Sequence, residues 1–307
     1  MRRTSALLLL SLLAAALLSG CLHAARGSSG AHAESSEEGT SGARGLPEAK
    51  AGAASEIEGD LAGAAEATSG VPFVAKTRAS GGSGYDADTV LAVRHGVYGD
   101  YERTIIDLGT GWETAADVPD WTLVSPEADG LLRISLPSAS ATRVSDGGFS
   151  GGLLEDFYIV QAPEGGMFVD FFARKSFLYR VLELEDPARL VVDFEPVGGE
   201  TKVSPFGKSE NTVLVEPRQH ARISDPLTVS GYSRNREGAN TVTLIDSHGE
   251  VLARRTVRSN DWNHTWGYFE ATLDLPPFSG NGTLKVGTEG ASEDSFEGIE
   301  VPIRASR

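Results

Sequence analysis

One serine of the chain lies in a motif that can build a nucleophile. Gly148-Phe149-Ser150-Gly151-Gly152 matches G-x-S-x-G, where the serine occupies a sharp turn between a strand and a helix and a histidine takes its proton. Here the motif runs into strand-like sequence, and in the order Ser, acid, His only the distant His220 or His248 could act as the base. We therefore interpret the motif as a flexible glycine-rich loop and predict no catalytic residue.

Other patterns that carry chemistry are missing from the sequence. The six histidines follow no metal-ligand spacing, and the chain has neither a phosphate-cradling glycine loop nor a calcium-binding loop. We predict that the protein is not an enzyme and uses no metal and no cofactor. The net charge of −16 at pH 7, without a basic cluster, argues against nucleic acid as a partner.

The one cysteine, Cys21, follows a short basic start and an apolar run from Leu7 to Leu18. Spanning a bilayer takes about 20 apolar residues, so this shorter run predicts a secretory signal peptide. Leu18-Ser19-Gly20-Cys21 resembles a bacterial lipobox, whose cysteine receives the lipid; the alternative is an ordinary signal peptide with a chance cysteine. The resemblance implies removal of residues 1–20, lipidation of Cys21, and an extracytoplasmic protein whose lipid anchors it to the bacterial cell membrane.

The elements that would position any site begin after residue 70. Residues 21–70 are rich in Gly, Ala, Ser and Glu and contain no aromatic residue, so we predict a disordered tether. Two folded modules follow, a first module at residues 71–198 and a second module at residues 210–307. Gly198, Gly199, Pro205 and Gly207 indicate a linker at residues 199–209.

Both modules show the alternation of strands and no long stretch with helical spacing. The predicted strands of the first module are Thr89–His95, Arg103–Leu108, Thr122–Ser125, Leu131–Leu136, Leu154–Gln161, Met167–Ala173, Phe177–Leu184 and Arg189–Glu195. Those of the second module are Thr212–Glu216, Leu227–Tyr232, Thr241–Asp246, Val251–Val257, Tyr268–Leu275, Gly282–Thr288 and Gly298–Ile303. We predict an all-β protein with two sandwich-type domains.

The last two strands of the first module form a predicted hairpin. Asp186-Pro187 makes its turn, and Leu190, Val192 and Phe194 share one face. The run from Tyr179 to Phe194, together with Val93-Arg94-His95 and Gly99 to Leu108, resembles the AMIN-like domains of bacterial envelope proteins. AMIN domains are associated with binding the cell wall and placing cell-wall amidases, so the resemblance implies a wall-contacting module.

The same hairpin places Arg189 and Asp193 on one face. This pair has two interpretations. It could contact a ligand, or it could form a partly exposed ion pair worth under about 1 kcal/mol.

Seven short strands in the second module predict an immunoglobulin-like sandwich without a disulfide. Val215-Glu216-Pro217-Arg218, the run from Ile223 to Gly231, and the run from Trp266 to Ala271 resemble the immunoglobulin-like domain of bacterial spore germination proteins. That family has no assigned chemistry, and the resemblance implies an interaction or spacer role.

Aromatic faces can stack on sugars and arginines can bind carboxylates. The candidate ligand-binding residues are therefore Tyr98, Tyr101, Arg103, Trp112, Trp121 and Trp262, some of which must be core residues. Trp262 and Trp266 are four residues apart in the sequence. Trp266 is expected to pack in the core, while Trp262 either covers it or meets a ligand. We predict a non-enzymatic envelope lipoprotein whose AMIN-like module binds cell-wall polymer (peptidoglycan). The alternative is a scaffold whose immunoglobulin-like module recruits another envelope protein, with a possible link to sporulation or germination.

Overall fold

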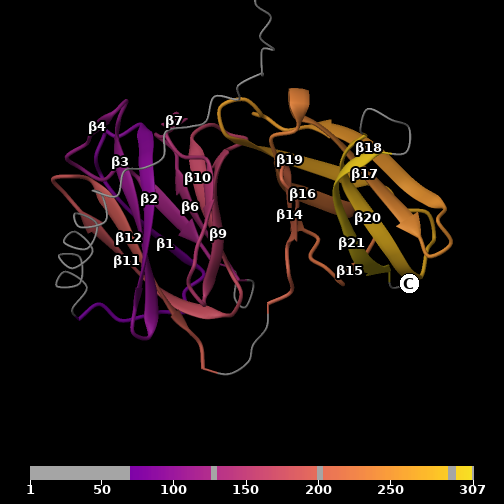
Figure 1. The fold of residues 1–307 in the computed structure, drawn as a ribbon, viewed down its shortest axis with the longest axis horizontal. Helices are drawn as coiled ribbons and strands as arrows, with labels where there is room; N and C mark the ends of the chain where they lie inside the picture. The colour runs from indigo at the N-terminus through magenta and orange to yellow at the C-terminus, as the bar shows by residue number, and fades with distance from the viewer. Residues whose placement is uncertain (1–69, 126–129, 199–202, 290–294, 306–307) are drawn as a thin grey trace, which may run out of the picture. The chain divides into compact units, whose positions relative to one another are not determined.

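The computed structural model describes residues 70–125, 130–198, 203–289 and 295–305. The described residues form strands joined by turns, with one 3-10 turn, η1 (Arg236–Gly238), and no α-helix (Figure 1). The predicted all-β class is therefore confirmed. No helix in this part of the chain is long and apolar enough to cross a membrane. The predicted signal peptide, Cys21 and the predicted tether up to residue 69 lie outside the described residues.

The first module is a sandwich of two sheets. Its strands are β1 (Arg78–Gly81), β2 (Thr89–Tyr98), β3 (Tyr101–Thr110), β4 (Glu113–Thr114), β5 (Trp121–Val124), β6 (Leu131–Leu136), β7 (Ala141–Thr142), β8 (Asp146–Gly148), β9 (Leu154–Gln161), β10 (Met167–Ala173), β11 (Phe177–Leu184) and β12 (Arg189–Pro196). One sheet has the order β11-β12-β3-β2-β7, and the other contains β1-β5-β6-β10-β9. Leu190, Val192 and Phe194 share one face, as predicted, and that face lies in the core between these sheets.

The second module is a smaller sandwich. Its strands are β14 (Thr212–Glu216), β15 (Arg222–Ile223), β16 (Leu227–Ser233), β17 (Ala239–Asp246), β18 (Val251–Arg258), β19 (Trp266–Leu273), β20 (Gly280–Glu289) and β21 (Phe296–Ala305). The end of the predicted linker forms one more strand, β13 (Gly207–Lys208), which pairs with β14. The order β15-β21-β20-β17-β18 makes one sheet, and β19-β16-β14-β13 makes the other. Their apolar faces enclose a core of their own, which includes Val229, Leu244, Phe269 and Val301.

The two modules are joined edge to edge as well as by the chain. Strand β19 pairs in parallel with β9, with Trp266 opposite Val160 and Gly267 opposite Gln161. This pairing extends one sheet through both modules, in the order β1-β5-β6-β10-β9-β19-β16-β14-β13. The described residues accordingly belong to a single compact unit.

A third hydrophobic cluster fills the space at this junction. Tyr158, Val160, Phe168 and Phe172 enter it from the first module, Phe206 enters it from the predicted linker, and Val213, Val215, Tyr232 and Trp266 enter it from the second module. The ring of Trp266 meets Tyr158 edge-on at 5.0 Å between centroids. Because β9 and β10 bury apolar side chains on both faces, the first module lacks a solvent-exposed sheet face here.

Polar groups at the junction are paired both within the first module and across to the second. Arg133 donates to both carboxylate oxygens of Asp170 at 2.8 Å, and the hydroxyl of Tyr232 donates to Asp170 Oδ2. The indole N–H of Trp266 donates to Asp146 Oδ1 at 3.0 Å. A buried charge without such partners would cost several kcal/mol, so these bonds favour one arrangement of the modules.

The expectation for Asp193 needs a correction. Its carboxylate is fully buried, and it accepts from Arg103 Nε at 2.6 Å and from Arg180 Nε at 2.7 Å. Arg189 Nε donates to the carbonyl of Pro187. Asp193 thus forms buried ion pairs with Arg103 on β3 and Arg180 on β11. Side chains on neighbouring strands lie closer to Asp193 than a side chain four residues away on its own strand.

Candidate ligand-binding site

Trp262 lies on a tight turn between β18 and β19, which we call the Trp262 turn (residues 260–265). Asp261 Oδ1 accepts hydrogen bonds from the backbone N–H groups of Trp262, Asn263 and His264, at 2.6, 3.0 and 3.2 Å. Burial acts to raise the pKa of Asp261, but these hydrogen bonds outweigh it and lower the pKa. The turn is therefore built around an ionised carboxylate.

Close contact with β19 fixes this turn further. A Cβ atom at Gly267 would lie 1.9 Å from the carbonyl oxygen of Asp261, so only glycine lets the turn approach the strand. Asn260 pairs with Tyr268 through its backbone N–H and its side-chain oxygen, at 3.0 and 2.8 Å. The turn leaves the Trp262 side chain 42% exposed, whereas Trp266 at the start of β19 is 1% exposed.

The Trp262 turn forms one wall of a hollow of about 660 Å³, which we call the junction hollow. The other wall is the hairpin turn between β9 and β10, in the first module. The residues that line it are Gln161, Ala162, Pro163, Gly165, Asn260, Asp261, Trp262, Asn263 and His264. The lining combines an aromatic ring with amides, an imidazole and a carboxylate. It contains no lysine or arginine.

Hydrogen bonds between the modules tie the two walls together. Asn260 Nδ2 donates to the carbonyl of Gln161 at 3.0 Å, and Thr265 Oγ1 donates to the carbonyl of Ile159 at 2.5 Å. On the hairpin side, Gln161 Nε2 donates to the carbonyl of Gly166 at 2.9 Å. The sequence indicated Trp262 as a candidate, but only the fold shows that its turn and the β9–β10 hairpin line one hollow.

Trp112 is the most exposed of the predicted candidates, at 77%. It lies on the turn between β3 and β4, and the guanidinium of Arg143 stacks 3.9 Å from its ring centroid. Arg143 Nε also donates to the carbonyl of Gly111 at 2.9 Å. The ring is thus oriented by a neighbour although it is not buried, which makes it available to a flat ligand.

Tyr98 and Tyr101 flank the turn between β2 and β3 and stack on each other at 5.5 Å. Both remain partly exposed, and Tyr101 lines a hollow of about 260 Å³ that also includes Lys175. The guanidinium of Arg103 lies 5.4 Å from the Tyr98 ring and 5.6 Å from the Tyr101 ring. Arg103 itself is completely buried and paired with Asp193, so it supports these rings from inside.

Trp121 is a core residue. It is 5% exposed, packs in the core of the first module, and donates its indole N–H to Glu183 Oε1 at 2.7 Å. The candidates therefore separate into exposed or partly exposed rings at Tyr98, Tyr101, Trp112 and Trp262, and buried side chains at Arg103 and Trp121.

The Ser150 motif follows β8 and leads into β9, so no helix begins after the serine. Glu102 lies under this loop and accepts from the backbone N–H groups of Leu153 and Leu154, at 2.6 and 3.1 Å. His95 Nε2 lies 2.9 Å from Glu102 Oε2, and its ring centroid lies 4.6 Å from that of Phe149, with the two rings tilted by 31°. Sequence order did not suggest this histidine, because it precedes the serine.

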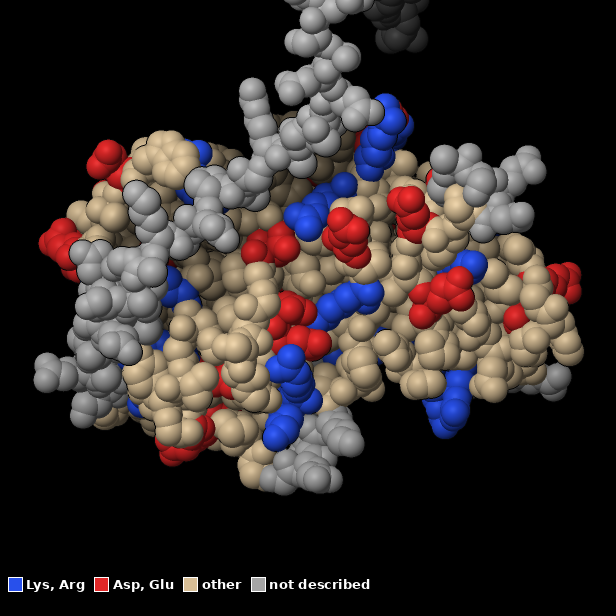
Figure 2. Space-filling view, in the orientation of Figure 1, with Lys and Arg blue, Asp and Glu red and all other residues tan. Residues whose placement is uncertain are grey.

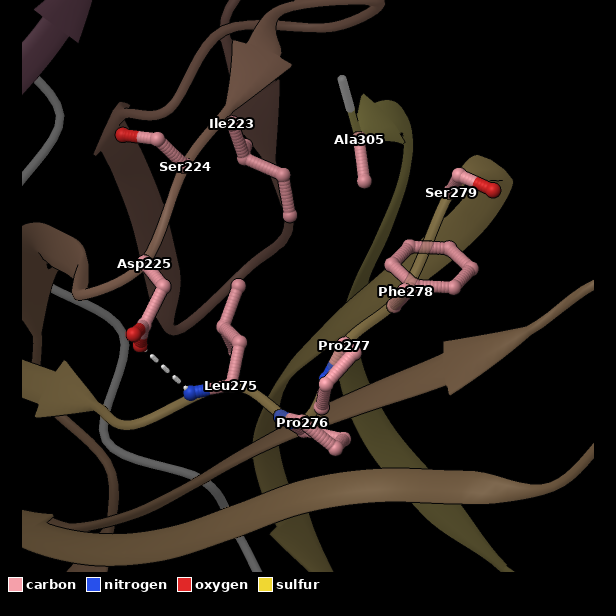
Figure 3. Close-up of a pocket in the computed structure, with 9 residues that line it drawn as sticks. All are labelled: Ile223, Ser224, Asp225, Leu275, Pro276, Pro277, Phe278, Ser279 and Ala305. Atoms are coloured by element: carbon pink, nitrogen blue, oxygen red, sulfur yellow. Dashed lines mark hydrogen bonds between the residues drawn. The ribbon is translucent and has the colours of Figure 1, made fainter. Parts of the chain in front are cut away.

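A third hollow, of about 580 Å³, lies at one end of the second module (Figure 3). Its lining is mainly apolar and includes Ile223, Leu275, Pro277 and Phe278, while Asp225 Oδ1 accepts from the backbone N–H of Leu275 at 2.8 Å. Leu275 and Phe278 also pack on the module's core. This hollow suits an apolar side chain better than a polar ligand.

The described residues contain no group of His, Cys, Asp and Glu side chains placed to hold a metal ion. Figure 2 shows acidic and basic side chains interspersed on the face in view.

Comparison with known proteins identifies the second module. Residues 211–295 match the family model described as the immunoglobulin-like domain of bacterial spore germination. No curated protein and no solved structure matches the chain. Strand β21 completes the sandwich beyond the matched range. The chain thus contains an immunoglobulin-like domain similar to those of bacterial spore germination, as the runs around Val215, Ile223 and Trp266 predicted.

Proposed function

We propose that the protein is a non-enzymatic binding protein of the bacterial envelope, anchored by a lipid at Cys21, which contacts cell-wall polymer through its first module. The lipobox resemblance and the tether support the location, and the AMIN-like resemblance supports the ligand. The immunoglobulin-like match at residues 211–295 supports a role in the envelope or in germination.

The observation that carries the proposal is the exposed ring of Trp112, oriented by Arg143. Large aromatic rings are normally buried, and a ring that is exposed and oriented is typical of a recognition surface. Wall glycan offers flat sugar faces to such a ring, and its peptides offer carboxylates to the adjacent guanidinium. Many equivalent sites on a polymer, together with several tethered copies on one membrane, would make weak contacts sufficient.

The wall contact is tested by co-sedimentation with purified sacculi, using the chain from residue 22 onward. Trp112→Ala should reduce the bound fraction several-fold, because the stacking surface is lost. Val251→Ala, which shortens an exposed side chain in the second module, is the matched control and should bind like the parent. Equal sedimentation of the parent and Trp112→Ala, or none by the parent, would remove the proposed wall contact.

The anchor is tested separately in Triton X-114 partitioning of the full chain expressed in bacteria. The parent should enter the detergent phase, and Cys21→Ala should remain in the aqueous phase, because acyl chains supply the membrane affinity. Partitioning of both proteins into the same phase would rule out lipid anchoring at Cys21.

A second candidate function is a protein-interaction scaffold that acts through the immunoglobulin-like module. The apolar hollow at Phe278 favours it, because such a hollow can accept an apolar side chain of a protein partner. Phe278→Asp should then weaken retention of a defined envelope protein in pull-down, while Trp112→Ala should not. Loss of wall binding in Trp112→Ala with no effect of Phe278→Asp would favour the first function.

A further inference from the structure

We propose that the junction hollow is a saccharide-binding site that takes an uncharged sugar, with one face of the sugar ring stacked on Trp262. This site is distinct from the Trp112 surface and is built by both modules. Its ligand can be tested with a free oligosaccharide, so the inference does not depend on wall binding by the first module.

The chemistry of the lining indicates the ligand class. Sugars present an apolar C–H face, which stacks on an aromatic ring, and hydroxyl groups, which bond to amides, imidazoles and carboxylates. Trp262 supplies the ring, and Asn263, His264 and Asp261 supply the polar groups. The size, about 660 Å³, falls within the range of roughly 300–1,000 Å³ that small-molecule sites occupy.

Charge excludes the other common polymers of an envelope. Phosphate and uronate groups need cationic partners, and none of the lining residues is lysine or arginine. Asp261 lies in the lining with a lowered pKa, and the whole chain carries a net charge of −16. An anionic ligand would therefore be repelled, whereas an N-acetylated or otherwise neutral sugar would not.

The backbone of the turn that carries Trp262 is ordered before any ligand arrives. The Asp261 carboxylate orders the turn through three backbone N–H groups, and Gly267 allows the turn to lie against β19. A site that is already ordered loses little conformational entropy on binding. Such an ordered site suits a ligand that binds weakly and is recognised mainly by stacking on one aromatic ring.

Both modules are needed because each supplies one wall. The hairpin containing Pro163 belongs to the first module, and the Trp262 turn belongs to the second. The bonds from Asn260 to Gln161 and from Thr265 to Ile159 fix the distance between the walls. A sugar chain seated in the hollow would therefore contact both modules together.

The test is calorimetric titration of the chain from residue 22 onward with N-acetylglucosamine tetramer, an uncharged probe. Trp262→Ala should weaken binding by about tenfold, the effect of losing one buried contact of roughly 1.4 kcal/mol. Trp262→Phe should restore part of the affinity because it keeps an aromatic face. Pro163→Asp, on the exposed turn of the other wall, should also weaken binding because it replaces an apolar ring of the lining with a strongly hydrated carboxylate.

Tyr85→Ala is the matched control, since it removes an exposed aromatic ring that belongs to neither proposed site, and it should bind the tetramer like the parent. A galacturonate tetramer should bind much more weakly than the neutral probe. Absence of binding by the parent, equal affinity of Trp262→Ala, no effect of Pro163→Asp, or equal affinity for the anionic probe would each overturn the inference. If the parent still sediments with sacculi in those cases, the proposed wall contact stands. Failure of the saccharide site and failure of the wall contact are therefore distinguishable.

Discussion

The side chain of Glu102 stabilises a neighbouring loop by accepting hydrogen bonds from its backbone. Glu102 is 4% exposed, yet it is surrounded by donors from Leu153, Leu154 and His95. Burial acts to raise the pKa of Glu102, but the hydrogen bonds outweigh it and lower the pKa from the ordinary 4.5. The carboxylate therefore fastens the loop that carries Ser150 to strand β3.

This pairing predicts a pH-dependent contribution to stability. A carboxyl whose pKa is lower in the folded state stabilises the fold at pH values above its unfolded pKa, near 4.5, and this contribution is lost as the pH falls through the folded pKa. Glu102→Gln should therefore cost about 1–3 kcal/mol of unfolding free energy at pH 7, because its amide cannot accept from all the donors. The cost should shrink toward about pH 3.

Urea unfolding of the parent and Glu102→Gln at the two pH values measures this difference. Glu164→Gln, on the exposed turn between β9 and β10, serves as the control and should have the same unfolding free energy as the parent at both pH values. A cost for Glu102→Gln that is the same at both pH values would contradict the proposed role of the charge.

At the scale of elements, β9 and β10 decide how the protein is built. Along β10, Met167, Val169 and Phe171 enter the core of the first module, while Phe168 and Phe172 enter the junction cluster. Such a strand is apolar at nearly every position, because both of its faces are covered. Asp170 is the exception, and it is paired with Arg133 and the hydroxyl of Tyr232. Strand β10 therefore needs a packing partner on each of its two faces.

At the scale of the whole molecule, the two modules behave as parts of one body. They share a sheet through the β9–β19 pairing and a hydrophobic cluster centred on Tyr158, Tyr232 and Trp266. Apolar area that is buried between two units is lost if either unit unfolds, so their unfolding is coupled. The junction hollow depends on this coupling, because its walls belong to different modules.

Calorimetry of the chain should therefore show one unfolding transition for both modules. Trp266→Ala, which removes a ring that is 1% exposed, should cost about 3–5 kcal/mol and split or broaden the transition. Trp262→Ala, in the neighbouring turn, is the matched control and should keep one sharp transition because its ring is exposed. Two separate transitions in the parent would show that the junction does not couple the modules.

The sequence by itself determined the all-β class and most strand positions. Leu131–Leu136, Phe177–Leu184 and Thr212–Glu216 were predicted with the bounds that the structure shows, because local alternation and turn residues encode them. The immunoglobulin-like domain was also recognisable, since its residues lie close together along the chain. Trp112 and Trp262 were candidates, but nothing in the sequence separated them from the buried Trp121.

Only the tertiary structure decided which candidates reach solvent and which residues meet. Arg103 and Asp193 are paired across strands, and the Trp262 turn faces a hairpin about a hundred residues earlier, because strand pairing joins positions that no local pattern links. The run of β10, apolar except for Asp170, was the one sequence signal of the junction. A short run of this kind, bounded by turn residues, is consistent with a strand buried on both faces, but it does not say that a second module covers one of them.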